Sequence, residues 1–353
     1  MIIINAVLNF LNNVWPYLVA VLMFIVLILI HEFGHFIAAK LMGVRVNEFA
    51  VGFGPKLFKK KWGETTYAVN LIPLGGYCAM EGEDEESADE RAFCRKKPWQ
   101  RFIIVVAGAV FNLLLGVILV AISLAPGELL GTTTVAKFTE EAVSNQYGLS
   151  AGDTIIEVDG RRIYTTYDLS YAFSNVDDGK IDIIVKRNGE KVALNDVRFE
   201  TEEYEGINYL QMDFYLYGEK KTVGNYIEHT LKTTVSYGRV VWFSLIDLIS
   251  GKYGISAVSG PVGITATVGS AAKQSLANLW PIMALITINL GIFNLLPIPA
   301  LDGGRLLFII YEMIFRKKVP EKFEGVVHTI GFVLLFGIMI LVTFKDIWSL
   351  ITG

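Results

Sequence analysis

Four long apolar runs constrain this chain more than any other feature of its sequence. They extend from Pro16 to Ala39, from Phe102 to Ala125, from Leu279 to about Phe315 and from Gly325 to Phe344. A helix needs roughly 20 predominantly apolar residues to cross the hydrocarbon core of a bilayer. The third run is too long for one simple span, and Pro297 and Pro299 interrupt it. The runs predict a polytopic α-helical membrane protein with four transmembrane helices, the third of them broken.

The composition agrees with a membrane protein and excludes other classes. Only 19% of the residues are charged, whereas a soluble domain has about 25%. A net charge of -4 offers no basic excess for binding nucleic acid. Cys78 and Cys94 are too few for a disulfide framework and are interpreted as inert thiols. The N-terminus has no basic region before its apolar run, so we expect that run to be retained as a helix rather than cleaved as a signal peptide.

The distribution of Lys and Arg predicts the orientation of the spans. Residues 1–15 contain neither, whereas residues 40–101 contain many and the short segment 316–322 contains four, at Arg316, Lys317, Lys318 and Lys322. Basic residues accumulate in cytoplasmic loops. Both basic segments are therefore predicted to be cytoplasmic, with the two termini and the middle of the chain outside, in a bacterial inner membrane.

Two segments outside the spans have patterns of their own. Residues 43–80 alternate apolar and polar residues between Gly-rich turns, which predicts a β-hairpin or small sheet against the cytoplasmic face of the membrane. The acidic run from Glu81 to Glu90 is interpreted as a solvated loop. Residues 223–250 predict an amphipathic helix on the outer membrane surface.

The middle of the chain changes to a soluble, mixed α/β composition from about residue 130 to 200. Gly152-Asp153 indicates a turn, Thr154 to Val158 a short strand and Asp159-Gly160 a hairpin turn. The pattern from Gly148 to Gly160 resembles the core strand and turns of a PDZ domain. Residues 181–186 and 191–194, separated by Asn188-Gly189, are typical of its closing hairpin. We therefore expect one extracytoplasmic PDZ domain.

These patterns divide the chain into consecutive segments. They are 1–42 (first transmembrane helix), 43–101 (cytoplasmic hairpin and acidic loop), 102–125 (second transmembrane helix), 126–205 (PDZ domain), 206–278 (amphipathic helix and linker), 279–315 (third transmembrane segment) and 316–353 (fourth transmembrane helix and C-terminus).

A His-Glu-x-x-His cluster lies within the first apolar run, as His31, Glu32 and His35. Positions i and i+4 share one face of a helix, so both imidazoles can bind one zinc ion, and Glu32 is placed to take a proton from a water molecule. Such a pattern also arises by chance in soluble helices. Inside a membrane, however, each ionisable residue costs at least about 2.5 kcal/mol on insertion scales, so three together indicate a function.

A catalytic zinc ion takes three protein ligands and keeps one position open. Asp302 follows two helix-breaking prolines and precedes Gly303-Gly304, so it can project into a cavity at membrane depth. Asp302 is therefore the predicted third ligand, and the alternative is a helix cap. Glu312, His328 and His229 lie farther from the expected depth of the site and are not predicted to be ligands.

Together these motifs resemble the site-2 protease family of intramembrane zinc metalloproteases, and within it the bacterial RseP/RasP-type branch with a single PDZ domain. The resemblance rests on His31-Glu32-x-x-His35, on Asn294-x-x-Pro297 with Leu301-Asp302-Gly303, on the PDZ-like segment, and on Gly108 to Asn112 in the second run. It implies Zn2+ bound by His31, His35 and Asp302, with Glu32 as the catalytic acid and base.

The resemblance also implies a substrate and its contacts. Asn112, Asn289 and Asn294 are expected to contact or orient the substrate, although an Asn in a membrane helix can instead join two helices. The expected partners are membrane lipid and single-pass transmembrane proteins shortened beforehand, such as anti-sigma factors or signal-peptide remnants, as in regulated intramembrane proteolysis. The alternatives are a catalytically inactive membrane scaffold and a metal transporter. The PDZ domain could recruit substrates or exclude those with bulky ectodomains.

Overall fold

The computed structural model describes residues 2–83, 85–174, 176, 178–204, 207–252 and 258–352. Asp84, in the predicted acidic loop, and Asn175, Asp177 and Glu205, in the predicted PDZ segment, lie outside the described residues. The chain forms two compact units. Unit 1 comprises residues 1–119 and 247–353, and unit 2 comprises residues 120–246.

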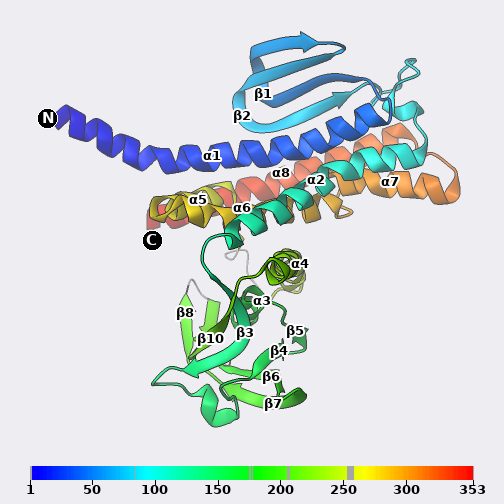
Figure 1. The fold of residues 1–353 in the computed structure, drawn as a ribbon. Coiled ribbons are helices and arrows are strands. Elements are labelled where there is room, and N and C mark those ends of the chain that lie inside the picture. Colours follow the sequence, from blue (N-terminus) through cyan, green and yellow to red (C-terminus); the bar gives the residue numbers. More distant parts are fainter. Residues whose placement is uncertain are drawn as a thin grey trace. The chain divides into compact units, whose positions relative to one another are not determined.

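Unit 1 is a set of long helices with a small sheet (Figure 1). Its helices are α1 (Ile2–Leu41), α2 (Pro98–Leu124), α5 (Pro261–Gln274), α6 (Leu279–Leu295), α7 (Asp302–Phe315) and α8 (Glu321–Thr352). Short 3-10 turns cover Phe93–Arg95 and Leu276–Asn278. Among the described residues, four stretches are long and apolar enough to cross a membrane, and they are Val14–Leu41, Pro98–Leu124, Leu276–Leu295 and Lys322–Ser349. Each stretch overlaps one of the four predicted apolar runs, but the third covers only the first half of the run predicted from Leu279 to about Phe315.

The third predicted segment, residues 279–315, is two helices rather than one. α6 ends at Leu295, and α7 begins at Asp302. Pro lacks the backbone N–H that a helix interior requires and also disfavours helical geometry in the residue before it. The chain therefore leaves the helix before Pro297 and Pro299 and re-enters it at Asp302.

α1 begins at Ile2, before the apolar run that starts at Pro16, and continues through Pro16 to Leu41, within the predicted segment 1–42.

The predicted hairpin over residues 43–80 is present as β1 (Val46–Trp62) and β2 (Thr65–Met80). Both strands bend, so they pair more than once along their length. On one side, residues 46–51 of β1 pair with residues 76–80 of β2. On the other side, residues 48–51 of β1 pair with residues 66–69 of β2. Residues 76–80 have only this one neighbour among the described strands, so they form an edge of the sheet. Glu83, just beyond this edge, pairs with Arg305 of α7.

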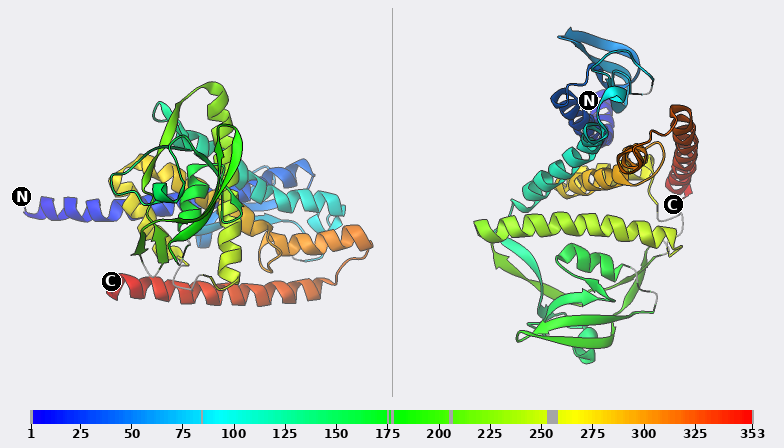
Figure 2. Two further views of the ribbon diagram at one scale, coloured as in Figure 1. Left: turned by 90° about the horizontal axis from the view of Figure 1, so that it is seen from below. Right: turned by 90° about the vertical axis from the view of Figure 1, so that its right-hand side faces the viewer.

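Glycines allow the helices of unit 1 to approach closely. A Cβ at Gly34 of α1 would collide with Ala107 O of α2, and one at Gly291 of α6 would lie 3.1 Å from Ala109 O. α2 therefore packs between α1 and α6. At the far end of the unit, Asp346 of α8 accepts hydrogen bonds from the backbone N–H groups at the start of α5. Figure 2 shows α1 and α8 with roughly parallel axes and opposite chain directions.

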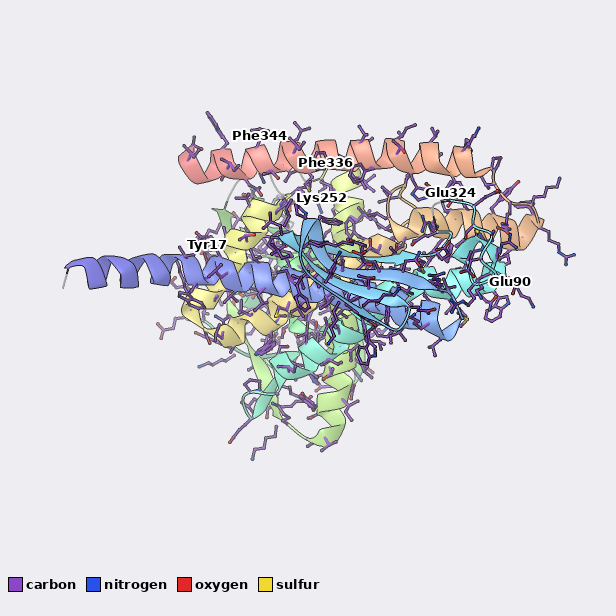
Figure 3. The ribbon with its side chains drawn as sticks, turned by 90° about the horizontal axis from the view of Figure 1, so that it is seen from above. Tyr17, Glu90, Lys252, Glu324, Phe336 and Phe344 are labelled. Atoms are coloured by element: carbon purple, nitrogen blue, oxygen red, sulfur yellow. The ribbon has the colours of Figure 1, made fainter. Side chains whose placement is uncertain are left out.

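α8 is the most exposed of the long helices. Its apolar side chains cover most of its circumference, including Phe332, Phe336, Leu341 and Phe344. Figure 3 labels Phe336 and Phe344 along this helix. A helix that is apolar all round and has little protein against it fits an environment of lipid.

Unit 2 is a mixed α/β domain with its own core. Its sheet has the strand order β10-β3-β4-β6-β7, with β5 paired to β4. The strands are β3 (Leu129–Phe138), β4 (Thr154–Val158), β5 (Arg161–Arg162), β6 (Lys180–Arg187), β7 (Glu190–Arg198) and β10 (Phe214–Lys220), with a separate pair β8 (Thr201–Tyr204) and β9 (Ile207–Leu210). A 3-10 turn covers Ser144–Tyr147, and α3 covers Thr166–Phe173. The predicted strand at Thr154 and the hairpin around Asn188-Gly189 are confirmed as β4 and as β6 and β7.

The sheet of unit 2 continues past the predicted boundary at residue 205. β10 lies in the segment for which a linker was expected, and it pairs antiparallel with β3 at the opposite end of the domain sequence. The predicted amphipathic helix follows as α4 (Val223–Ile249). Asp168 of α3 accepts hydrogen bonds from Ser236 and Arg239 of α4, so this helix is attached to the domain.

Candidate metal centre

The two imidazoles lie on one face of α1, under a glycine of α2. His31 and His35 are one turn apart, and their residues are 7% and 8% exposed. A Cβ added at Gly108 would lie 2.4 Å from Nε2 of His35 and 2.8 Å from Cε1 of His31. Only a residue without a side chain therefore leaves room for both rings at this crossing.

The loop between α6 and α7 brings a carboxylate to the same place. Ala300 adopts a left-handed conformation (φ 74°), and its N–H donates to Nδ1 of His328 on α8 at 3.0 Å. A Cβ at Gly303 would collide with the carbonyl oxygen of Leu296, so the first turn of α7 folds directly onto the loop. Asp302 is the first residue of α7 and faces the two imidazoles.

Three electron-pair donors converge in this cluster. Oδ2 of Asp302 lies 3.1 Å from Nε2 of His31 and 3.2 Å from Nε2 of His35, and the two Nε2 atoms are 3.2 Å apart. Oδ2 of Asp302 is buried and has no hydrogen-bond partner among the described residues. Zinc–ligand bonds of about 2.0–2.1 Å at tetrahedral angles place ligand atoms about 3.3 Å apart. The spacing and the chemistry of the three donors therefore fit a zinc ion with one position left open.

The second nitrogen of each imidazole also contacts α2. Nδ1 of His35 lies 2.9 Å from the carbonyl oxygen of Ile104. Nδ1 of His31 lies 3.2 Å from the side-chain amide of Asn112. Among the described residues, His31, His35 and Asp302 form the one group of three His, Cys, Asp or Glu side chains with metal-binding geometry.

Glu32 lies between this cluster and the edge of the sheet. It is partly exposed, and a Cβ at Gly76 of β2 would come within 3.5 Å of its Cγ. Gly76 belongs to the edge segment 76–80. An extended chain placed along this edge would therefore pass beside the Glu32 carboxylate.

The three predicted substrate-contacting asparagines differ in position. Asn112 is completely buried, with its side chain on His31. Asn289 is exposed on α6 and Asn294 is partly exposed at the end of the same helix. Neither of these two amides makes a hydrogen bond within the described part of the chain. Asn289 and Asn294 are thus accessible, whereas the contact of Asn112 is with a histidine and not with an open surface.

Other candidate residues lie outside the cluster. His229 pairs with Glu219 in unit 2. His328 supports the loop before Asp302, a role that the sequence analysis missed because nothing in the sequence places α8 against residues 299–300. Burial raises the pKa of the Cys78 thiol well above its usual value. Both cysteines are free, and the Cys78 thiol stays protonated near neutral pH, which agrees with an inert role.

Comparison with known proteins agrees with the geometry. Residues 19–338 match peptidase family M50. A protein of Clostridium perfringens is 38% identical over 332 residues, covering 93% of this chain and 97% of that protein. One of Clostridium acetobutylicum is 38% identical, covering 93% and 96%. One of Staphylococcus aureus is 30% identical, covering 94% and 98%. All three carry the provisional name of zinc metalloprotease.

The matching family and the three converging side chains together define the class of this protein, a metalloprotease. The chain belongs to peptidase family M50, the site-2 protease family. It is a membrane protein, and its cofactor is Zn2+.

Proposed function

We propose that this protein hydrolyses peptide bonds within the transmembrane segments of other proteins, and that His31, His35 and Asp302 bind its zinc ion. The observation that carries the proposal is the convergence of Asp302, at the start of α7, with two histidines of α1, a helix long and apolar enough to span a membrane. Ionisable residues in such helices are costly to insert and mark functional sites.

The depth of the cluster supports cleavage inside the bilayer. His31 is 17 residues from the start of the apolar stretch Val14–Leu41 and 10 residues from its end. At 1.5 Å per residue these separations are about 25 Å and about 15 Å along the helix axis, against a hydrocarbon core about 30 Å thick. The site therefore lies at membrane depth, closer to the end followed by the Lys-rich segment. We propose that this end is cytoplasmic and that both termini lie outside an inner membrane.

Within the site, Glu32 performs the proton transfers. Bound zinc supplies Lewis-acid chemistry and makes water a stronger acid. The carboxylate of Glu32 accepts the proton of the attacking water and then donates it to the nitrogen of the departing amine, so one residue is base and acid in turn. Gly108 and Gly34 keep α2 close above the imidazoles, which limits the space for other water around the reacting atoms.

The substrate segment must leave its helical conformation before hydrolysis, and its amides then need partners. We propose that residues 76–80 pair with it as an added strand, because their outer edge has no partner strand among the described residues and Gly76 lies close to Glu32. Asn289 and Asn294 offer amides that have no partner in the described part of the chain, in a helix at membrane depth. An unsatisfied amide is costly there, which favours a polar partner such as the unwound substrate.

Unit 2 is proposed to be an extracytoplasmic PDZ domain that controls access to substrates. α4 exposes a row of apolar side chains at helical spacing, listed here as Val223, Ile227, Leu231, Val235, Trp242 and Ile246. Such a face fits the surface of the outer leaflet. Deleting residues 129–220 separates the two possible roles. Cleavage of full-length substrates increases if the domain excludes them and decreases if it recruits them.

The proposal is tested with the full chain in proteoliposomes that contain a single-pass substrate of known sequence. The Glu32→Gln variant is expected to bind one zinc ion per chain, as the wild type does, and to leave the substrate uncut. Glu228→Gln, an exposed position in unit 2, is the matched control and should cleave at the wild-type rate. Undiminished cleavage by Glu32→Gln would refute the assignment of Glu32. If the wild type were as inactive as Glu32→Gln, the alternative of a membrane scaffold without catalysis would be favoured.

A further inference from the structure

α2 contributes two residues to the surroundings of the proposed metal ligands. Gly108 faces the two rings, and Asn112, one turn later, lies against His31. The family resemblance implies that Asn112 contacts or orients the substrate, but its side chain is completely buried. Its function must therefore be exerted on a neighbour inside the protein.

An intramembrane Asn can also join two helices by a side-chain hydrogen bond, and Asn112 does link α2 to α1, but the atom that it contacts is a ring nitrogen of a proposed metal ligand. The contact of α2 with α6 at this position uses only the backbone of Asn112, because Oγ1 of Thr287 donates to its carbonyl oxygen at 3.2 Å. The side chain of Asn112 takes no part in that contact. It is directed instead at Nδ1 of His31, 3.2 Å away.

Whether Nδ1 of His31 carries a proton decides which atom of the Asn112 amide, the oxygen or the nitrogen, faces it. The Nε2 atoms converge with Asp302, so His31 offers Nε2 to the metal and must carry its proton on Nδ1. A protonated Nδ1 is a donor and requires an acceptor, which the amide nitrogen cannot provide. The oxygen and the nitrogen of a side-chain amide are nearly identical in shape, so their positions are assigned from the hydrogen bonds that they make. The amide oxygen, which has no other partner among the described residues, is thus the atom that faces Nδ1.

We propose that Asn112 is a positioning residue for the metal site: its amide oxygen accepts the Nδ1 proton of His31 and holds the ring in the tautomer that binds zinc through Nε2. His35 receives the same support from a backbone group, the carbonyl oxygen of Ile104, at 2.9 Å. α2 therefore orients both imidazoles, one by its main chain and one by the side chain of Asn112. Outer partners of this kind fix ring orientation and ligand basicity. The inference rests on the proposed ligand set.

The test measures zinc affinity of the full-length protein in detergent, by competition between the metal-free chain and a chromophoric chelator. Asn112→Leu has nearly the same size and no acceptor, whereas Asn112→Asp keeps an oxygen at the same place. Asn112→Leu should weaken zinc binding about 10- to 100-fold, and Asn112→Asp should stay within about threefold of the wild type. Thr287→Val, which removes the neighbouring hydrogen bond to the main chain of Asn112, is the matched control and should bind zinc as the wild type does.

A second readout is the visible absorption spectrum of the chain loaded with Co2+. It should match the wild type for Asn112→Asp and shift for Asn112→Leu, because ring orientation sets the ligand geometry. If Asn112→Leu does not fold, Asn112→Ala replaces it with the same expectation. Equal zinc affinity of the acceptor-free variants and the wild type would overturn the proposal, and so would equal losses for the acceptor-free variants and Asn112→Asp. Unchanged affinity in His31→Ala would instead refute the ligand set itself.

Discussion

Gly108 is the position at which the smallest substitution should cause the largest loss of metal. A Cβ there would lie 2.4 Å from Nε2 of His35, 2.7 Å from its Cε1 and 2.8 Å from Cε1 of His31. An ordinary contact of about 3.4 Å requires the ring of His35 to retreat by about 1 Å. Metal–ligand distances tolerate about 0.2 Å. The displacement is about five times that tolerance, so Gly108→Ala should lose at least as much zinc affinity as the loss of an outer partner costs, about 10- to 100-fold.

Gly116, two turns along the same helix, provides the matched control. A Cβ there would also meet an atom at 2.4 Å, but that atom is Cγ1 of Ile288, a side chain remote from the metal. Gly116→Ala should therefore lower thermal stability without changing zinc affinity, when both are measured on full-length protein by chelator competition and thermal unfolding. Wild-type zinc affinity in Gly108→Ala would refute the close packing of α2 on the imidazoles.

Two further predictions concern the ends of the helices. Asp346→Ala removes the acceptor for two backbone N–H groups at the start of α5, bonded at 2.9 and 2.8 Å, and should lower the free energy of unfolding by about 2–4 kcal/mol in a detergent unfolding assay. An effect below about 0.5 kcal/mol would contradict it. Asp168→Asn weakens the bond from Arg239, 2.9 Å long, and should cost unit 2 about 2 kcal/mol. Limited proteolysis should then cut α4 faster than in the wild type.

The sequence was most informative where local spacing determines geometry. His31 and His35 share a face because of the helical repeat, and their convergence needed no knowledge of the rest of the fold. Asp302 could be predicted because prolines and glycines around it break the helix at the depth of the histidines. The hairpin at Asn188-Gly189 followed from turn chemistry, which is also local.

The sequence was less informative where distant elements meet. The contact of Asn112 with His31 depends on the angle between α2 and α1, and the support of Ala300 by His328 depends on the placement of α8. β10 was missed because its role comes from pairing with β3, which lies at the other end of the domain sequence. Phe214 and Leu216 of β10 face the core, but the exposed Tyr215 and Tyr217 are also apolar in part, so the sequence shows no alternation of apolar and polar residues. Pairing between distant strands leaves little trace in a local pattern.

The central claim is that the buried cluster of His31, His35 and Asp302 cuts peptide bonds inside the membrane. The most direct measurement is the position of the cleaved bond in a single-pass substrate, identified by mass spectrometry of products from proteoliposomes containing the wild type or Glu32→Gln. The account predicts a cut within the apolar segment of the substrate, abolished by Glu32→Gln although zinc is retained. Cuts confined to the flanking aqueous segments, or the same products from both proteins, would contradict it.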